Sequence, residues 1–321
     1  MHSGSKAAAP GTAEGRGLQR KSGWISYVPA GRSDRQGYLF VSPAMILFGI
    51  FILYPMCYIL QASLYRWDGI GEATFVQFDN YLRLLAADPA FRLALRNALY
   101  WAPLTIFPQM LLGFAIAYVL TSGVPGQTLL RAIFYIPAII SPVVVGIVWQ
   151  RIYNPFGGLL SDIGLATGWS FLLSPFLADT KTAIFAVILV NVWQWTGFSM
   201  LLYIAGIQGL PDEMFDSAKV EGATSWQTIR HIVWPMLRHV HLTLILLGVI
   251  GTLQTFPLIY MLTSGGPNHA TEMLPNYIFQ QAFRLQSMGY ASAISVVLVF
   301  LALGLSLFQV RVLGARFALT Q

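Results

Sequence analysis

The stretch DSAKVEGATSWQTIRHIVWP, Asp216–Pro235, places two acids, a lysine, an arginine and a histidine between long apolar runs. The 321-residue chain around it is 56% hydrophobic and only 10% charged, whereas soluble domains carry about 25% charged residues. Its mean hydropathy is +0.62. This composition predicts a membrane protein rather than a soluble protein with an unusually apolar core. The charged stretch is then expected to lie outside the membrane.

Six apolar runs are long enough to cross a bilayer, because a helix of about 20 apolar residues spans about 30 Å of hydrocarbon. We therefore expect an all-α membrane protein with six transmembrane helices. Gly248, Gly251 and Pro257 favour a bend in the fifth span, although close helix packing would explain the glycines equally well. The runs cover residues 39–62, 97–121, 129–151, 181–206, 239–263 and 287–311.

The distribution of Lys and Arg predicts the orientation of these spans. If the N-terminus is inside, twelve of these residues lie on the inner side and seven on the outer side. The inner excess predicts that both termini are cytoplasmic, and it accounts for the net charge of +6 without a nucleic-acid partner. We expect a disordered cytoplasmic tail over 1–38, a six-helix domain over 39–315 and a second cytoplasmic tail over 316–321.

An outer segment precedes the second span. Residues 75–101 have the spacing of an amphipathic helix that is broken at Asp88-Pro89. This helix would lie at the membrane interface, with or without a role in recognition.

The segment between the fourth and fifth spans is predicted to fold as a helix, a glycine break and a second helix. Pro211 suits the first helical position, where its missing N–H costs nothing, and Gly222 suits the helix end. Thr224 and Gln227 match a capping box for the second helix. Each helix would have an apolar face that either packs on the protein itself or docks a second protein. These faces comprise Leu210, Met214, Phe215 and Ala218 in the first helix, and Trp226, Ile229 and Val233 in the second.

The segment resembles the EAA loop of permease subunits of binding-protein-dependent ABC importers. The family pattern runs Glu-Ala-Ala, two residues, Asp-Gly-Ala, and then a hydrophobic stretch that ends near Ile-x-Leu-Pro. This chain departs from the pattern at residues 216, 217, 221 and 234, but keeps an acid at both acidic positions. The matching residues are Asp216-Ser217-Ala218, Glu221-Gly222-Ala223 and Ile232-Val233-Trp234-Pro235.

Three further segments resemble the carbohydrate-uptake subfamily, of the maltose and glycerol-phosphate type, so that the resemblance covers most of residues 40–311. The chain is similar to the first permease subunit of those importers. The segments are FDNYLRLLAADPAFRLALRNALYW from Phe78, FYIPAIISPVVVGIVWQRIYNPFGGLL from Phe134 and PLIYMLTSGGPNHATEMLPNYIFQQAF from Pro257.

The resemblance implies that residues 207–236 form a coupling loop whose helix binds a cytoplasmic ATPase. It also implies a second homologous permease, two ATPase subunits and an external sugar-binding protein, in a bacterial or archaeal inner membrane. No GxxxxGK[ST] motif occurs in the sequence, so we expect ATP and Mg to be bound by the ATPase and not by this chain. By analogy, Asp216 would face a basic residue of that ATPase. The residues expected in coupling are Met214, Phe215, Asp216, Ala218, Lys219, Glu221, Gly222 and Ala223.

Polar side chains within the fourth and fifth spans are candidates for the substrate pathway. Such groups are costly in lipid and usually face a bundle interior. They would bind sugar hydroxyls, with tryptophan offering a flat apolar face to a sugar ring, or else they tie helices together. In the resembled family, sugar contacts fall in these parts of the chain. The candidates are Asn191, Trp193, Gln194, Trp195, Thr252, Gln254 and Thr255.

The absence of Lys, Arg, Asp and Glu from the span centres favours a neutral sugar. Import of glycerol phosphate or a sugar phosphate is the alternative within the same class, and a secondary transporter or channel is the alternative from another class. No nucleophile and base, carboxylate pair or metal cluster suggests an enzyme. His239 and His241 do not share a helix face, so no metal site is expected.

Overall fold

The computed structural model describes residues 33–318, which are mostly helical. The chain divides into two compact units, Met1–Pro55 and Met56–Gln321. In the first unit, α1 continues through a π-helical turn, η1, into α2, which crosses the boundary between the units. Within this stretch Gly37–Ala62 is long and apolar enough to span a membrane, in line with the predicted span at 39–62. Of the predicted tail at 1–38, residues 1–32 lie outside the described residues. The bounds are α1 Ser33–Phe48, η1 Gly49–Leu53 and α2 Tyr54–Ala62.

A short hairpin and a short helical segment lead into the next long helix. Two antiparallel strands pair Tyr65 with Phe75, and the helical segment that follows ends at Asp88. The Asp88 side chain accepts a hydrogen bond from the N–H of Phe91 at 3.0 Å, and Pro89 begins α4. The break predicted at Asp88-Pro89 is therefore confirmed, and its cause is helix capping. The elements are β1 Tyr65–Arg66, β2 Thr74–Phe75, α3 Asp79–Leu82, η2 Arg83–Ala87 and α4 Pro89–Thr121.

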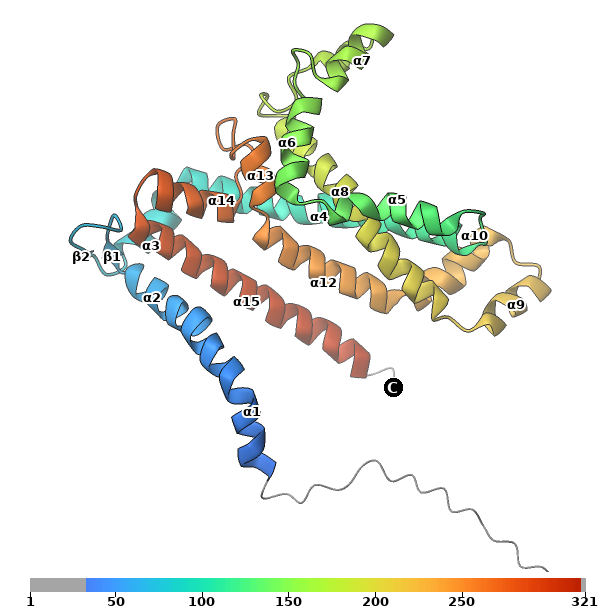
Figure 1. The fold of residues 1–321 in the computed structure, drawn as a ribbon, viewed down its shortest axis with the longest axis horizontal. Helices are drawn as coiled ribbons and strands as arrows, with labels where there is room; N and C mark the ends of the chain where they lie inside the picture. The colour runs from blue at the N-terminus through green and yellow to red at the C-terminus, as the bar shows by residue number, and fades with distance from the viewer. Residues whose placement is uncertain (1–32, 319–321) are drawn as a thin grey trace, which may run out of the picture. The chain divides into compact units, whose positions relative to one another are not determined.

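The centre of the second unit is the packing of α4 along α8, which spans Ala183–Gln208, with α12, Arg238–Gln254, against both (Figure 1). Close approach depends on glycine: a Cβ at Gly113 would lie 2.7 Å from the Cβ of Ser199. Phe114, Met200 and Tyr203 are buried in this core. In lipid, close packing of such side chains rather than their removal from water holds the helices together.

The run predicted as the third span is two helices that meet at 94°. α5, Gln127–Ile139, ends because Ile140 and Ser141 are extended, with ψ of 134° and 133°. Pro142 then occupies the first turn of α6, Pro142–Ile152. Proline disfavours helical conformation in the residue before it, which explains a break that the apolar pattern alone does not predict.

The fifth predicted span, 239–263, also differs from the structure. α12 ends at Gln254, and α13, Pro257–Leu262, begins after a break at Thr255 and Phe256. Pro257 causes this break for the same reason, so the expected bend is a full interruption. At its other end, α12 forms a bent pair at 63° with the helical stretch Ser225–Met236.

Side-chain hydrogen bonds fix the segments around Asp88 and after α13. The Asn97 side chain donates to the backbone carbonyls of His269, Ala270 and Glu272, which fixes the loop after α13 to α4. The carboxylate of Asp88 accepts hydrogen bonds from the hydroxyls of Tyr277 and Tyr290. The remaining elements are α7 Leu159–Thr167, η3 Ser170–Leu173, α14 Leu274–Phe279, η5 Gln280–Arg284 and α15 Met288–Ala318.

Asp88 owes its protonation state to this setting. Burial by itself raises the pKa of Asp88, but the hydrogen bonds from Tyr277, Tyr290 and the N–H of Phe91 outweigh it. The net effect holds the Asp88 pKa below its ordinary value.

In the described residues, four helices are individually long and apolar enough to cross a membrane, and the count rises to six if each bent pair is one span. The four are Gly37–Ala62, Pro89–Thr121, Ala183–Gln208 and Met288–Gln309. This confirms a helical multi-pass membrane protein. α15 continues to Ala318, so the predicted tail at 316–321 begins within its last described turn.

Candidate functional site

The charged stretch folds as predicted into two short helices. α9, Asp212–Val220, has Asp212 and Glu213 in its first turn and Lys219 in its last turn, as the helix dipole favours. Pro211 is the residue before the helix and not its first residue, a shift of one position from the expectation. Asp216 forms an ion pair with Lys219 at 3.0 Å on the exposed side of α9.

A glycine turn separates α9 from the second helix. Gly222 has φ of +72°, a left-handed conformation that glycine adopts without steric cost. Thr224 and Gln227 then form the predicted capping box: the N–H of Thr224 donates to Gln227 Oε1 at 2.7 Å, and the N–H of Gln227 donates to Thr224 Oγ1 at 3.3 Å. The second helix comprises α10 Ser225–Thr228, η4 Ile229–Val233 and α11 Trp234–Met236.

The two helices are anchored on one side only. Ala218 is buried, and Phe215 and Ile229 pack against the core formed by α4, α8 and α12. The apolar face predicted for α9 is thus partly confirmed, because it lies on the protein itself. In the second helix Val233 is buried but Trp226 is 67% exposed, so the predicted shared stripe does not form.

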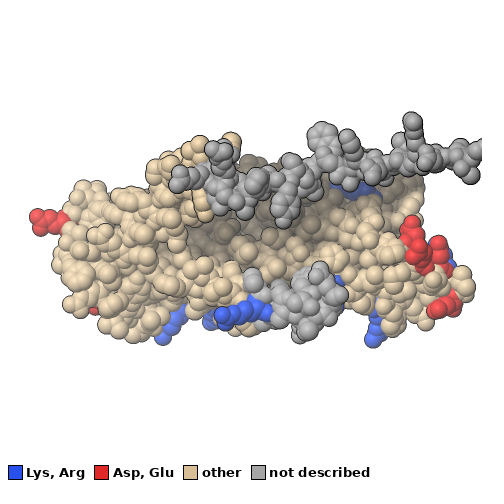
Figure 2. Space-filling view, turned by 90° about the horizontal axis from the view of Figure 1, so that it is seen from below, with Lys and Arg blue, Asp and Glu red and all other residues tan. Residues whose placement is uncertain are grey.

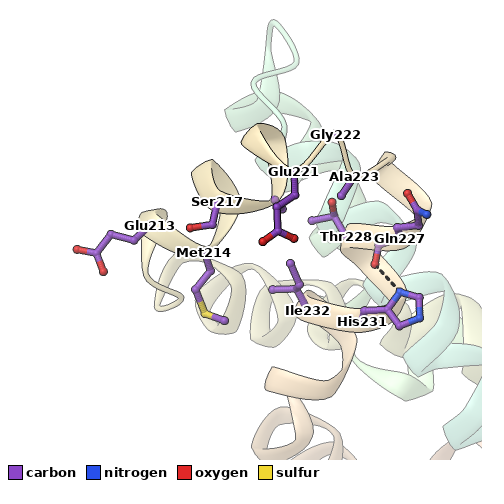
Figure 3. A pocket seen from close by; sticks show the side chains of 11 residues that line it. Glu213, Met214, Ser217, Glu221, Gly222, Ala223, Gln227, Thr228, His231 and Ile232 are labelled. Atoms are coloured by element: carbon purple, nitrogen blue, oxygen red, sulfur yellow. Dashed lines mark hydrogen bonds between the residues drawn. The ribbon is translucent and has the colours of Figure 1, made fainter.

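A groove of about 630 Å³ lies between the two helices. Figure 3 shows the carboxylate of Glu221 turned into this groove, with Met214 and Ile232 nearby, and the carboxylate of Glu213 turned outward. Figure 2 shows acidic side chains gathered at the end where Figure 1 places α9, beyond a mostly uncharged face. Of the eight predicted coupling residues, five line the groove: Met214, Ala218, Glu221, Gly222 and Ala223.

The other three predicted coupling residues lie elsewhere on α9. Phe215 packs inward against the core. Asp216 and Lys219 are exposed and paired with each other. Within this chain, then, the acid in the groove is Glu221 rather than Asp216.

A second hollow, of about 400 Å³, lies between α4, α8 and α12. The structure brings six of the seven predicted pathway residues to its lining, so residues of the fourth and fifth predicted spans do face one space. Trp193 is the exception, because it packs edge-on against Trp149 with ring centroids 5.4 Å apart. The six are Asn191, Gln194, Trp195, Thr252, Gln254 and Thr255.

Sequence reasoning missed the contribution of α4 to this cavity. Trp101, Thr105 and Gln109 line it, and Gln109 Nε2 donates to Asn191 Oδ1 at 2.9 Å. Gln109 lies within an apolar span, so the rule that selected Asn191 and Gln194 would have selected it too.

Gln194 joins the cavity to the broken third span. Its side chain is fully buried, and its Nε2 donates at 3.0 Å to the carbonyl of Ile140 at the break. The Gln194 Oε1 atom has no hydrogen-bond partner within the described chain. A buried polar atom without a partner is costly.

Within the described residues no three His, Cys, Asp or Glu side chains are grouped as metal ligands. His241 instead contacts Tyr203 Oη at 2.7 Å and the carbonyl of Trp234 at 3.0 Å.

Apolar helices around a cavity that carries amides and hydroxyls, with one structured charged loop, are the features of a membrane transport domain. The profile of the binding-protein-dependent transport system inner membrane component family matches residues 109–316. The chain belongs to this family, which confirms the predicted ABC importer permease.

Two curated relatives and one solved structure illustrate the match. The chain is 35% identical to the probable ABC transporter permease protein YurN of Bacillus subtilis, over 85% of this chain and 94% of YurN. It is 31% identical to the multiple sugar-binding transport system permease protein MsmF of Streptococcus mutans, over 86% and 94%. Its fold is similar to a chain of a bacterial ABC transporter that imports the acidic polysaccharide alginate, with TM-score 0.76, 22% identity and coverage of 87% and 95%.

Proposed function

We propose that the chain is the permease subunit of an ATP-driven importer for a neutral sugar or oligosaccharide. The observation that carries this proposal is the cavity between α4, α8 and α12, whose largely apolar lining carries amides and hydroxyls but no charged side chain. It lies in a member of a transport family whose relatives include a multiple sugar-binding system. This chain supplies part of a translocation path and is not itself an enzyme.

The chemistry of the cavity suits a sugar. Amides and hydroxyls from α8 and α12 offer donors and acceptors for sugar hydroxyls, and Trp101 and Trp195 offer flat apolar faces.

The charge of the cavity separates the proposal from its alternatives. None of the lining residues among those the structure describes is Lys, Arg, Asp or Glu. A glycerol phosphate or sugar phosphate would gain from a basic contact, and a proton-coupled secondary transporter would need an ionisable relay. A neutral sugar needs neither.

The loop over 207–236 is proposed to couple the cavity to ATP hydrolysis. If both termini are cytoplasmic, as the distribution of Lys and Arg favours, the segment between the fourth and fifth spans would lie on the cytoplasmic side. The groove around Glu221 has no Lys or Arg among its described lining residues, and Glu213 at its side turns its carboxylate outward (Figure 3). This groove and the exposed side of α9 would bind a cytoplasmic ATPase, with Glu221 accepting a basic side chain.

The working unit would then contain a second homologous permease, two ATPase subunits and an external sugar-binding protein, in a bacterial or archaeal inner membrane. ATP and Mg would be bound by the ATPase subunits. Closure of the ATPase pair would displace α9 and open the cavity outward, and hydrolysis would return it to the inward-open state.

ATP hydrolysis by the reconstituted complex, in the presence of binding protein and a panel of sugars, tests the proposal. Wild type is compared with Gly222→Arg, whose side chain projects from an open turn. Stimulation by one neutral sugar, lost in Gly222→Arg while the complex still assembles, is expected. Stimulation by phosphorylated sugars only would favour the alternative substrate class, and transport that needs no ATPase would refute the importer.

A further inference from the structure

The joint between the coupling loop and α12 is held by side chains. The stretch Ser225–Met236 and α12 meet at 63°, with Leu237 between them. His241, in the first turn of α12, reaches back across this bend, and its Nε2 lies 3.0 Å from the carbonyl oxygen of Trp234. One imidazole thus connects the two sides of the joint.

The same imidazole also contacts α8. Its Nδ1 lies 2.7 Å from the hydroxyl oxygen of Tyr203, whose side chain is fully buried. Because the carbonyl of Trp234 can only accept, the Nε2 atom carries the hydrogen. The Nδ1 atom then accepts from the hydroxyl of Tyr203, so a neutral imidazole satisfies both contacts.

Aromatic packing reinforces the joint. The ring of Trp234 lies 4.2 Å from that of His241 and 4.9 Å from that of Phe114 on α4. The ring of Tyr203 lies 5.4 Å from that of Phe114. The end of the coupling loop is therefore held against α4, α8 and α12 at one point.

This point adjoins the cavity. Ser199 and Leu244 line the cavity; Ser199 lies one helical turn from Tyr203 on α8, and Leu244 lies one turn from His241 on α12. A rotation of the coupling loop about the joint would therefore act directly on two helices of the cavity wall.

We propose that His241 is a positioning residue that fixes the angle between the coupling loop and α12 through its hydrogen bond to Trp234. When the ATPase displaces α9, this contact makes α12 and the cavity wall move with the loop. The inference rests on the proposed function, and assigns the coupling to one contact outside the groove and the cavity.

The two ring nitrogens can be tested separately by isosteric substitution. In His241→Gln the amide Nε2 replaces the imidazole Nε2 and keeps the contact with Trp234. In His241→Asn the amide Oδ1 replaces Nδ1 and keeps only the contact with Tyr203. His241→Ala removes both contacts, and Tyr203→Phe removes the Tyr203 hydroxyl alone.

The measurement is the ratio of sugar transported to ATP hydrolysed by the complex in proteoliposomes, at matched amounts of assembled complex. In His241→Ala and His241→Asn the ratio should fall at least about fivefold, the lower end of ordinary coupling free energies. In His241→Gln and Tyr203→Phe it should stay near wild type. A merely structural role would lower the yield of complex and leave the ratio unchanged.

Equal ratios in His241→Gln and His241→Asn would overturn the inference, because the Trp234 contact would then carry no special weight. If wild-type complex shows no sugar-dependent ATP hydrolysis, the proposed function fails, and the inference fails with it. A working wild type with an unchanged ratio in His241→Ala refutes the inference alone.

Discussion

Gly251→Leu tests the cavity with little disturbance to the fold. Gly251 lies inside α12 and lines the cavity, and a Cβ built on it has no neighbour within 4 Å. Glycine in a helix interior is about 1 kcal/mol less favourable than alanine, and leucine is close to alanine. The substitution should therefore preserve or slightly raise stability while its side chain occupies part of the 400 Å³ space.

The expected loss follows from the hydrogen bonds that the bound sugar would forfeit. If the leucine side chain displaces the sugar from one or two hydrogen bonds, each worth about 1 kcal/mol, the affinity for the sugar falls by about five- to thirtyfold. The assay is the sugar concentration that gives half-maximal uptake by the reconstituted complex, measured together with the thermal unfolding midpoint.

Gly304→Leu is the matched control, because Gly304 lies inside α15 and a Cβ there also has no neighbour within 4 Å. It should leave uptake unchanged. If Gly251→Leu folds as wild type and keeps wild-type uptake, the cavity is not the sugar path and the reasoning is refuted.

Three further predictions concern Gly222, Asn97 and Asp88. Gly222→Val should reduce sugar-stimulated ATP hydrolysis because a β-branched residue resists a φ of +72°, whereas Gly222→Asn should retain it; equal loss in both would refute the conformational reason. Asn97→Ala leaves three backbone carbonyls without their donor and should destabilise the complex by about 1–3 kcal/mol, seen as a lower unfolding midpoint, and an unchanged midpoint would contradict it. Asp88→Asn should be less stable than wild type at neutral pH; because the Asp88 pKa is lowered in the fold, the gap should close as pH falls below about 4, and a gap that widens in acid would contradict the assignment.

Local signals predicted the loop well. The Gly222 turn and the Thr224–Gln227 capping box depend on residues only a few positions apart, so the sequence contains their whole cause. The outward position of Trp226 depends on how the second helix packs on the core, which no local pattern contains.

Long apolar runs were less informative about where helices stop. Hydropathy is continuous through Ile140 and Thr255, although Pro142 and Pro257 interrupt both helices. Proline was the available signal, and the prediction of one continuous span at 129–151 did not use it.

The cavity lining, too, was predicted only where local spacing determines it. Gln194 and Trp195 lie three and four residues after Asn191 on α8, so all three share a face, as helical periodicity requires. Trp193 departs from that spacing and packs against Trp149 instead. The lining residues of α4 depend on tertiary packing, which brings Gln109 into hydrogen-bond contact with Asn191.

Uptake of labelled sugar into proteoliposomes that contain the assembled complex and its binding protein tests the central claim most directly. Accumulation of one neutral sugar should require ATP and persist when ionophores abolish the proton and sodium gradients. Accumulation that continues without ATP and stops with the ionophores would contradict the account, because the chain would then act as a gradient-driven carrier.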